Sequence, residues 1–327
     1  MIDCKVKLYE AKVLADSVSY AGVRLTTLVV NMPRIILAEF NTHRVFSRNS
    51  ASSRAIPVEK RIKMIEEDPY IPLQFGRNKS GMQSTEILEE SEAVVARQEW
   101  IKAMHSAIGH ARELAKLEVH KQFANRLLEP FSPHTVIVSS TEWENMYALR
   151  IHPDAQPEFH KVAAAIHAAR DASYPEGIDH GESYWHLPLI DRTSDDAKLS
   201  LMDQIKVSAG RCARVSYVTH DGVRDPSKDI ELHDRLLSSG HMSPLEHQAT
   251  PLRVAEICVD CEELDTAFRG NFRGWNQYRK MIPGEDVFRK LQTLSRCCNA
   301  SLSGQLHGKS SYNGLYFACA KCGKVVL

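Results

Sequence analysis

The sequence lacks several features that would by themselves assign a class of protein. Its formal net charge is +0 at pH 7, so no global field would draw it to nucleic acid or to an anionic membrane. No apolar run approaches the roughly 18 residues that a membrane span needs, and residues 1–5 lack the order of a secretory signal. We therefore expect a cytoplasmic protein without a membrane or nucleic-acid partner, in which any polyanion binds at a local site.

Cysteine is scarce, with 8 residues in a chain of 327. Without a signal sequence, these cysteines are expected to be reduced or bound to a metal. Cys319 and Cys322 have the C-x2-C-G spacing of a zinc knuckle, and Cys297 and Cys298 could complete the ligand set, with or without His307. Because two adjacent cysteines do not easily bind one ion, a structural zinc and a tail without zinc both stay open.

The spacing of apolar residues indicates a chain of mixed α and β structure. Alternating or β-rich windows predict strands, and apolar residues at helical spacing predict helices. The predicted strands cover residues 23–30 and 136–141, and the predicted helices cover residues 33–46, 84–129, 156–171 and 228–239. Pro33 suits the first turn of its helix, and the second helix is either continuous or broken near Gly109.

A polar segment, residues 43–54, follows the apolar run 32–40. It contains one histidine, three arginines, one asparagine and four serines. Guanidinium groups bind phosphate through paired hydrogen bonds, and serine hydroxyls can satisfy the remaining oxygens. The segment therefore suits a ligand that carries phosphate, and a solvated basic loop is the alternative.

This segment resembles the signature of the flavin-dependent thymidylate synthases, R-H-R-x7-S, which extends to R-H-R-x-x-S-x-N-x-x-S-x-R. The residues in register are His43, Arg44, Ser47, Asn49, Ser52 and Arg54. Thr42 replaces the first arginine of the signature. We call residues 43–54 the signature segment.

Other parts of the chain are similar to further sequence blocks of the same family. The similar residues are Arg126 with Pro130 for A-R-x-x-L-P, Asn145 with Leu149 and Arg150, residues 155–158, residues 213–217 for A-R-V-S-Y, and residues 240–247 for G-H-x-S/T-P-x-E-H. In ordinary members the last two blocks precede the signature, whereas here they follow it. We therefore expect a rearranged order that arose by circular permutation or by duplication followed by divided loss, which a fold tolerates when its ancestral ends lie close together.

The resemblance implies an α/β (α+β) fold with a mixed or antiparallel sheet and long helices. We place this thymidylate synthase-like catalytic domain in residues 1–290 and a cysteine-containing tail in residues 291–327. The family forms homotetramers with active sites between subunits, so the resemblance also implies an oligomer.

The reaction that the resemblance implies is methylation at C5 of a pyrimidine nucleotide, most simply dUMP to dTMP. Methylenetetrahydrofolate would supply the carbon, and reduced FAD, recharged by NADPH, would supply the hydride. Arg150 and Ser52 are the implied catalytic residues, Ser52 by binding substrate and not as a nucleophile. The implied substrate-binding residues are Ser52, Arg54, Arg126, Arg150 and Glu39, and the implied FAD-binding residues are His43, Arg44, Asn49, Asn145, Ser216, His241 and Ser243.

The chain departs from the family pattern at Thr42, at Ser50 in place of glutamate, at Ala55 in place of tyrosine, and at Glu39 in place of glutamine. A carboxylate accepts from an exocyclic amine but repels a carbonyl oxygen, so Glu39 raises the hypothesis of a cytosine nucleotide. Methylation of UMP and hydroxymethylation of dUMP or dCMP also stay open. The alternative of another class is a non-catalytic descendant that binds nucleotides or nucleic acid.

Overall fold

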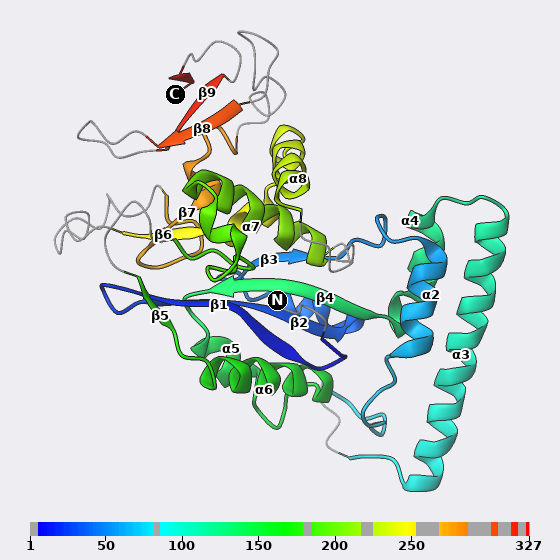
Figure 1. The fold of residues 1–327 in the computed structure, drawn as a ribbon. Coiled ribbons are helices and arrows are strands. Elements are labelled where there is room, and N and C mark those ends of the chain that lie inside the picture. The colour runs from blue at the N-terminus through cyan, green and yellow to red at the C-terminus, as the bar shows by residue number, and fades with distance from the viewer. Residues whose placement is uncertain are drawn as a thin grey trace.

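The computed structural model describes residues 6–81, 86–178, 185–216, 225–252 and 268–286, and three short strands beyond them. Its centre is a five-stranded sheet with the order β3-β4-β2-β1-β5 (Figure 1). The strands are β1 (Ala11–Ser19), β2 (Arg24–Pro33), β3 (Ser47–Ser50), β4 (Pro133–Ser140) and β5 (Glu176–Ile178). Neighbouring strands are antiparallel except for β5, which pairs with β1 in parallel. The predicted mixed sheet is confirmed.

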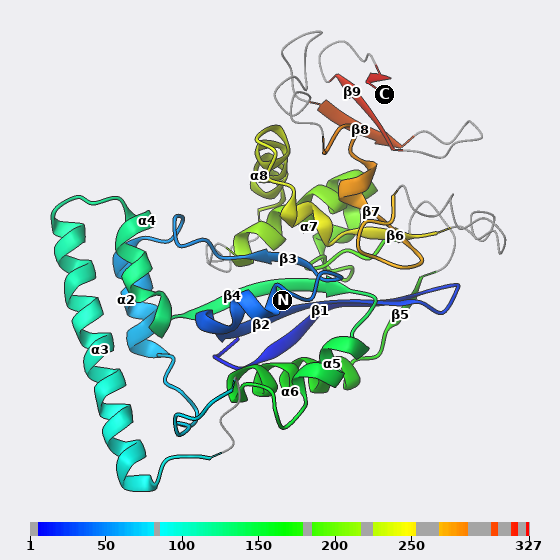
Figure 2. The same cartoon turned by 180° about the vertical axis from the view of Figure 1, so that it is seen from behind.

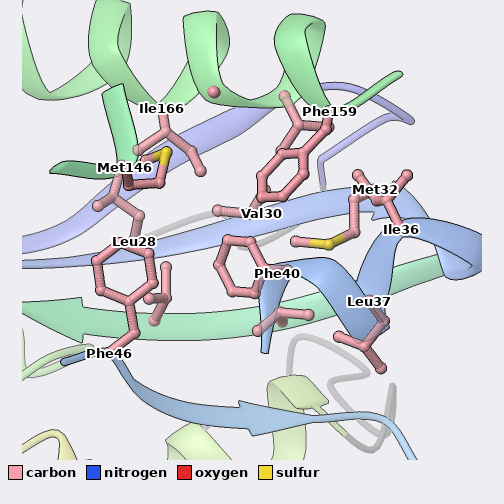
Figure 3. Close-up of a cluster of buried hydrophobic side chains, with 14 of the residues drawn as sticks. Leu28, Val30, Met32, Ile36, Leu37, Phe40, Phe46, Met146, Phe159 and Ile166 are labelled. Carbon is pink, nitrogen blue, oxygen red and sulfur yellow. The ribbon is translucent and has the colours of Figure 1, made fainter. Parts of the chain in front are cut away.

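Helices cover both faces of this sheet, which explains why β2 is apolar along most of its length. On one face lie α5 (Glu144–Arg150) and α6 (Pro157–Asp171), and on the other lie α7 (Leu201–Ser216) and α8 (Pro226–Ser238) (Figure 1). Leu28, Val30 and Met32 pack with Phe159 and Ile166 of α6 in the largest buried cluster (Figure 3). The alternate residue Val29 packs with Cys212 and Val215 of α7.

A helical arm extends from one end of the sheet (Figure 2). It consists of α2 (Val58–Glu67), α3 (Glu90–Lys116), α4 (Lys121–Ala124) and the 3₁₀ helix η2 (Asn125–Phe131), with its own apolar cluster. The predicted long helix is present without a break at Gly109, but it ends at Lys116, well before residue 129, and α4 and η2 follow it. It begins later than residue 84 because Glu89 and Glu92 form the capping box at its first turn.

The predicted helix over residues 33–46 is wrong. Pro33 is the last residue of β2 and pairs with Pro133, and only a 3₁₀ turn, η1 (Arg34–Ile36), and the four-residue α1 (Leu37–Phe40) follow it. Nη1 of Arg48 donates to the carbonyl oxygens of Asn41 and His43 at 3.2 and 2.9 Å. These carbonyls are thus bound by a side chain, and the chain turns into β3.

The C-terminal half adds η3 (Asp195–Lys198), η4 (Ser243–Glu246), β6 (Ala249–Pro251), β7 (Trp275–Gln277) and η6 (Tyr278–Met281). Beyond them, β8 (Leu302–Leu306), β9 (Leu315–Cys319) and β10 (Val325–Val326) form a three-stranded sheet. The boundary between residues 290 and 291 stays a prediction. Within the described ranges, none of the helices is both long and apolar enough to cross a membrane.

The predicted zinc ligands fall almost wholly outside the described part of the chain. Cys297, Cys298 and Cys322 are not described, and Cys319 is described only as a backbone position at the end of β9. Among the described side chains, no group of three or more His, Cys, Asp and Glu could hold a metal ion. The zinc site stays a prediction.

Candidate active site

The signature segment begins after α1, contains β3 and ends in the turn that follows β3. β3 is an edge strand of the sheet and pairs with β4, with Ser47 opposite Ser139 and Ser50 opposite Val136. The polar side chains of the signature segment and their partners form three groups. One group lies before β3, one lies on β3 and one lies after it.

The group before the strand is built around Arg150, the last residue of α5. Its Nε donates to Nε2 of His43 at 3.1 Å, and its Nη1 donates to Oε2 of Glu39 at 2.9 Å. The guanidinium also lies 4.5 Å from the ring centroid of Phe159. The side chains of His43, Glu39 and Phe159 thus fix the plane of the Arg150 guanidinium.

His43 is a neutral acceptor in this group. Burial, and then the charges of Arg150 and Arg48, lower its pKa from 6.5 to about 4. Because Nε2 accepts from Arg150, the ring proton lies on Nδ1. His43 therefore orients Arg150 and carries no charge of its own near neutral pH.

The group on the strand joins the signature segment to the C-terminal half. Asn49 of β3 is 4% exposed, and its Nδ2 donates to the carbonyl oxygen of Cys212 in α7 at 3.1 Å. The hydroxyl of Ser243 in η4 lies 3.5 Å from Oδ1 of the same asparagine. Two predicted FAD-binding residues, Asn49 and Ser243, are thereby brought together from distant parts of the sequence.

The group after the strand contains the predicted phosphate clamp, which we define as Ser52, Arg54 and Arg126. Oγ of Ser52 accepts from the backbone N–H of Arg54 at 3.3 Å. The Arg54 side chain is exposed and makes no hydrogen bond or ion pair within the described ranges. Nη1 of Arg126 donates to Oε1 of Glu129 at 2.9 Å, and the hydroxyl of Ser53 donates to the same oxygen. Ser53 and Glu129 therefore link the turn after β3 to η2, which carries Arg126.

Glu129 was missed by the sequence reasoning. Burial alone would raise the pKa of this carboxyl, but the hydrogen bond from Ser53 and the nearby cations Arg34 and Arg126 lower it overall. Glu129 is therefore ionised at neutral pH. A signal was available, because this glutamate stands where the A-R-x-x-L-P block has leucine.

The other predicted FAD-binding residues are not joined to these groups. Arg44, Asn145 and His241 are exposed, and Nδ1 of His241 shares a hydrogen bond with the hydroxyl of Ser239 at 2.9 Å. Ser216 is the last residue of α7, and its side chain lies outside the described part of the chain.

Comparison with known families finds one match, in the first half of the chain. Residues 21–176 match the model of the family described as thymidylate synthase complementing protein. This match confirms the resemblance to the flavin-dependent thymidylate synthases over a segment that begins before β2 and ends at β5. The segment ends before the blocks at 213–217 and 240–247, so the permuted order stays a prediction.

Two solved structures are also similar to this chain. Both are of the UMP/dUMP methylase PolB from Streptomyces cacaoi, one bound with 5-Br UMP and one with 5-Br dUMP. Each is 15% identical and covers 50% of this chain, with TM-scores of 0.42 and 0.41 over 90% and 91% of the methylase chain. No curated protein sequence matches this chain.

Proposed function

We propose that the protein is a flavin-dependent enzyme that methylates C5 of a pyrimidine nucleotide, converting dUMP to dTMP. The observation that carries this proposal is the contact of Asn49 with α7 and η4. This contact joins Cys212 of α7 and Ser243 of η4 to the signature strand, and it supports the proposal because one flavin site would draw on these parts of the chain together. A protein that only bound nucleotides would have no use for this second set of residues.

The phosphate of the nucleotide would bind at the clamp. Arg54 offers an uncommitted guanidinium, and Ser52 offers a hydroxyl at the turn after β3. Arg126 is held at one nitrogen by Glu129, which leaves its other donors for a ligand.

The pyrimidine would lie against Arg150. Its guanidinium donors suit a carbonyl oxygen of the base, and they would stabilise the negative charge that develops on the ring as C5 attacks the one-carbon unit. His43, as a neutral acceptor, holds the plane of this guanidinium without adding positive charge. Glu39 would accept from an N–H group of the base.

The residues available fit FAD in their chemistry. Arg44 and Asn145 are exposed, and their side chains have no hydrogen-bond partner within the described ranges, so a cation and an amide remain for the cofactor. Bound FAD, reduced by NADPH, would supply the hydride that completes the methyl group from methylenetetrahydrofolate. Asn49 would shape the site through the backbone of α7. Exposure of Arg44 and Asn145 is consistent with a site completed by another subunit of a homotetramer.

The proposal is tested by incubating the full chain with FAD, NADPH, methylenetetrahydrofolate and dUMP, UMP or dCMP in parallel. We expect a nucleotide product whose mass corresponds to an added methyl group, formed fastest from dUMP. A product with an added hydroxymethyl group, or faster use of UMP or dCMP, would select one of the alternatives. Absence of any product together with absence of flavin binding would contradict the enzyme and favour the non-catalytic descendant.

A further inference from the structure

Within the described part of the chain, one buried arginine of α2 has no carboxylate partner. Arg61 of α2 is only 2% exposed. Within the described ranges, no carboxylate oxygen lies within 4.0 Å of its guanidinium nitrogens. Its hydrogen bond, from Nη1 to the carbonyl oxygen of Pro133, is long at 3.4 Å. A buried guanidinium without a counter-charge is strongly unfavourable, so this arrangement calls for a partner.

Two further residues with buried, unpartnered side-chain nitrogens belong to the same end of the sheet. The backbone N–H of Arg34 donates to the carbonyl oxygen of Ser132 at 3.0 Å, and His134 follows Pro133 directly in β4. His134 is 2% exposed, and neither ring nitrogen has a hydrogen-bond partner. Nε of Arg34 and Nε of Arg61 are also buried without a partner. We call Arg34, Arg61 and His134 the buried cationic cluster.

The buried cationic cluster has more positive charge than the carboxylate beside it compensates. Burial, and then the charges of Arg34 and Arg61, lower the pKa of His134 to about 3, so its ring is neutral. Burial lowers the pKa of Arg61 to about 10, which leaves it protonated at neutral pH. The one acid beside them within the described ranges is Glu129, which is 3.6 Å from Arg34 and already accepts from Ser53 and Arg126. This carboxylate contacts Arg34 and Arg126, and within the described ranges none contacts Arg61.

We propose that the buried cationic cluster binds a halide-sized anion, with chloride as the physiological ligand. Water would satisfy the orphaned N–H groups but would leave the positive charge uncompensated. The four orphaned nitrogens are closed to solvent, so the ligand is small. Arg34 is partly exposed, and among the described residues its side chain is held only by the 3.6 Å ion pair with Glu129, so movement of this side chain admits the ion. The inference is independent of flavin and nucleotide.

The anion would also support the clamp. By compensating part of the positive charge of Arg34 and Arg61, it would leave Glu129 bound to Ser53 and Arg126, which ties the turn after β3 to η2. Asn125 strengthens the same link, because its Nδ2 donates to the carbonyl oxygens of Ser53 and Ile56 at 2.7 and 2.8 Å.

The first test is the melting temperature of the full chain in sodium chloride, sodium bromide or sodium gluconate at equal ionic strength, without nucleotide or flavin. We expect chloride and bromide to raise Tm by about 3 °C per tenfold increase in concentration above the dissociation constant. Gluconate, which is too large for a closed site, gives the reference Tm. Equal Tm in all three salts would overturn the proposal.

Variants of the cluster residues test whether chloride stabilises the protein by binding at this site. Arg61→Met and Arg34→Gln should each abolish the difference between chloride and gluconate. The matched control is Arg112→Gln, whose guanidinium makes exposed ion pairs with Glu59 and Glu66 and which should keep the wild-type response. If Arg61→Met does not fold, the Arg34→Gln result decides. An anomalous bromide peak among the three side chains in crystals would confirm the site, and an ordered water there with no bromide would contradict it.

Discussion

Nη1 of Arg150 donates to Oε2 of Glu39 across 2.9 Å, so the arginine predicted to contact the pyrimidine is bound to an acid of its own chain. The two side chains are 20% and 45% exposed. An ion pair at this exposure contributes at most about 1 kcal/mol, so a base that enters the site can share or displace it. Glu39 and Arg150 therefore belong in one functional unit, and their variants are informative as a pair.

We expect Arg150→Lys to lower kcat for dUMP by about 100-fold, because lysine cannot donate to His43 and Glu39 while facing the base. The comparison variant is Glu39→Gln, which keeps a hydrogen-bond acceptor for Arg150 and should change turnover of dUMP by less than about fivefold. Steady-state kinetics with dUMP measures both. Full activity of Arg150→Lys would remove Arg150 from the reaction.

The base preference can be tested at Glu39. If the carboxylate accepts from the exocyclic amine of cytosine, Glu39→Gln should lower the ratio of dCMP to dUMP use in single turnovers. Equal or better use of dUMP by the wild-type protein would remove the cytosine hypothesis.

Asn49→Ala should lower the free energy of unfolding by about 1–3 kcal/mol, because it removes a buried donor to the carbonyl oxygen of Cys212. Asn145→Ala is the contrasting variant, since Asn145 is exposed and should leave stability unchanged while weakening FAD binding. Urea denaturation and FAD titration of both variants test this. Equal stability losses would contradict the different roles assigned to the two asparagines.

Arg126→Gln should raise the dissociation constant of dUMP at least about tenfold and leave that of deoxyuridine, which has no phosphate, almost unchanged. Isothermal titration of both ligands provides the comparison. A similar loss for nucleoside and nucleotide would show that Arg126 acts through the fold and does not bind phosphate.

Buried histidines should make stability depend on pH, and besides His43 and His134 they include His186 and His247. Nε2 of His186 bonds to Thr27 at 2.7 Å, and Nδ1 of His247 bonds to Ser139 at 2.8 Å. Burial lowers the pKa of each from 6.5 to about 3. Between these values the unfolded chain binds more protons than the folded one, so the stability present above pH 6.5 is lost as the pH falls toward 3.

The expected slope in this window approaches about 1.4 kcal/mol per pH unit for each histidine. Denaturant unfolding at several pH values measures it. His241→Gln is the control, because His241 is exposed and its removal should not change the slope. A free energy of unfolding that stays constant from pH 7 to pH 5 would contradict the neutral buried state of His186 and His247.

The sequence correctly predicted the helices and strands whose own residues carry an apolar run or a periodic spacing of apolar residues. The apolar run of β2 and the helical spacing in α3, α6 and α8 gave the right element types, because each element buries a face that its own residues define. The helix expected from Pro33 to Phe46 failed because Arg48, which follows it, binds the carbonyls of Asn41 and His43. Such a side-chain contact has no periodic signal.

The candidate site was predictable where the family blocks apply and not where tertiary contacts decide. Arg150 and His43 were expected in one site, yet their hydrogen bond, and the placement of Glu39 on the same guanidinium, follow from the packing of α1 against α5 and α6. The hydrogen bond between Ser53 and Glu129 forms only because η2 lies beside the turn after β3. Residues that act through contacts this distant in sequence cannot be recognised from spacing.

The visible absorption spectrum of the purified protein during titration with FAD and then dUMP tests the central claim most directly. Our account predicts that FAD binds and that dUMP shifts its spectrum, with the shift lost in Arg150→Lys and in Arg126→Gln. A protein that stays colourless, or a bound flavin whose spectrum ignores every pyrimidine nucleotide, would contradict it.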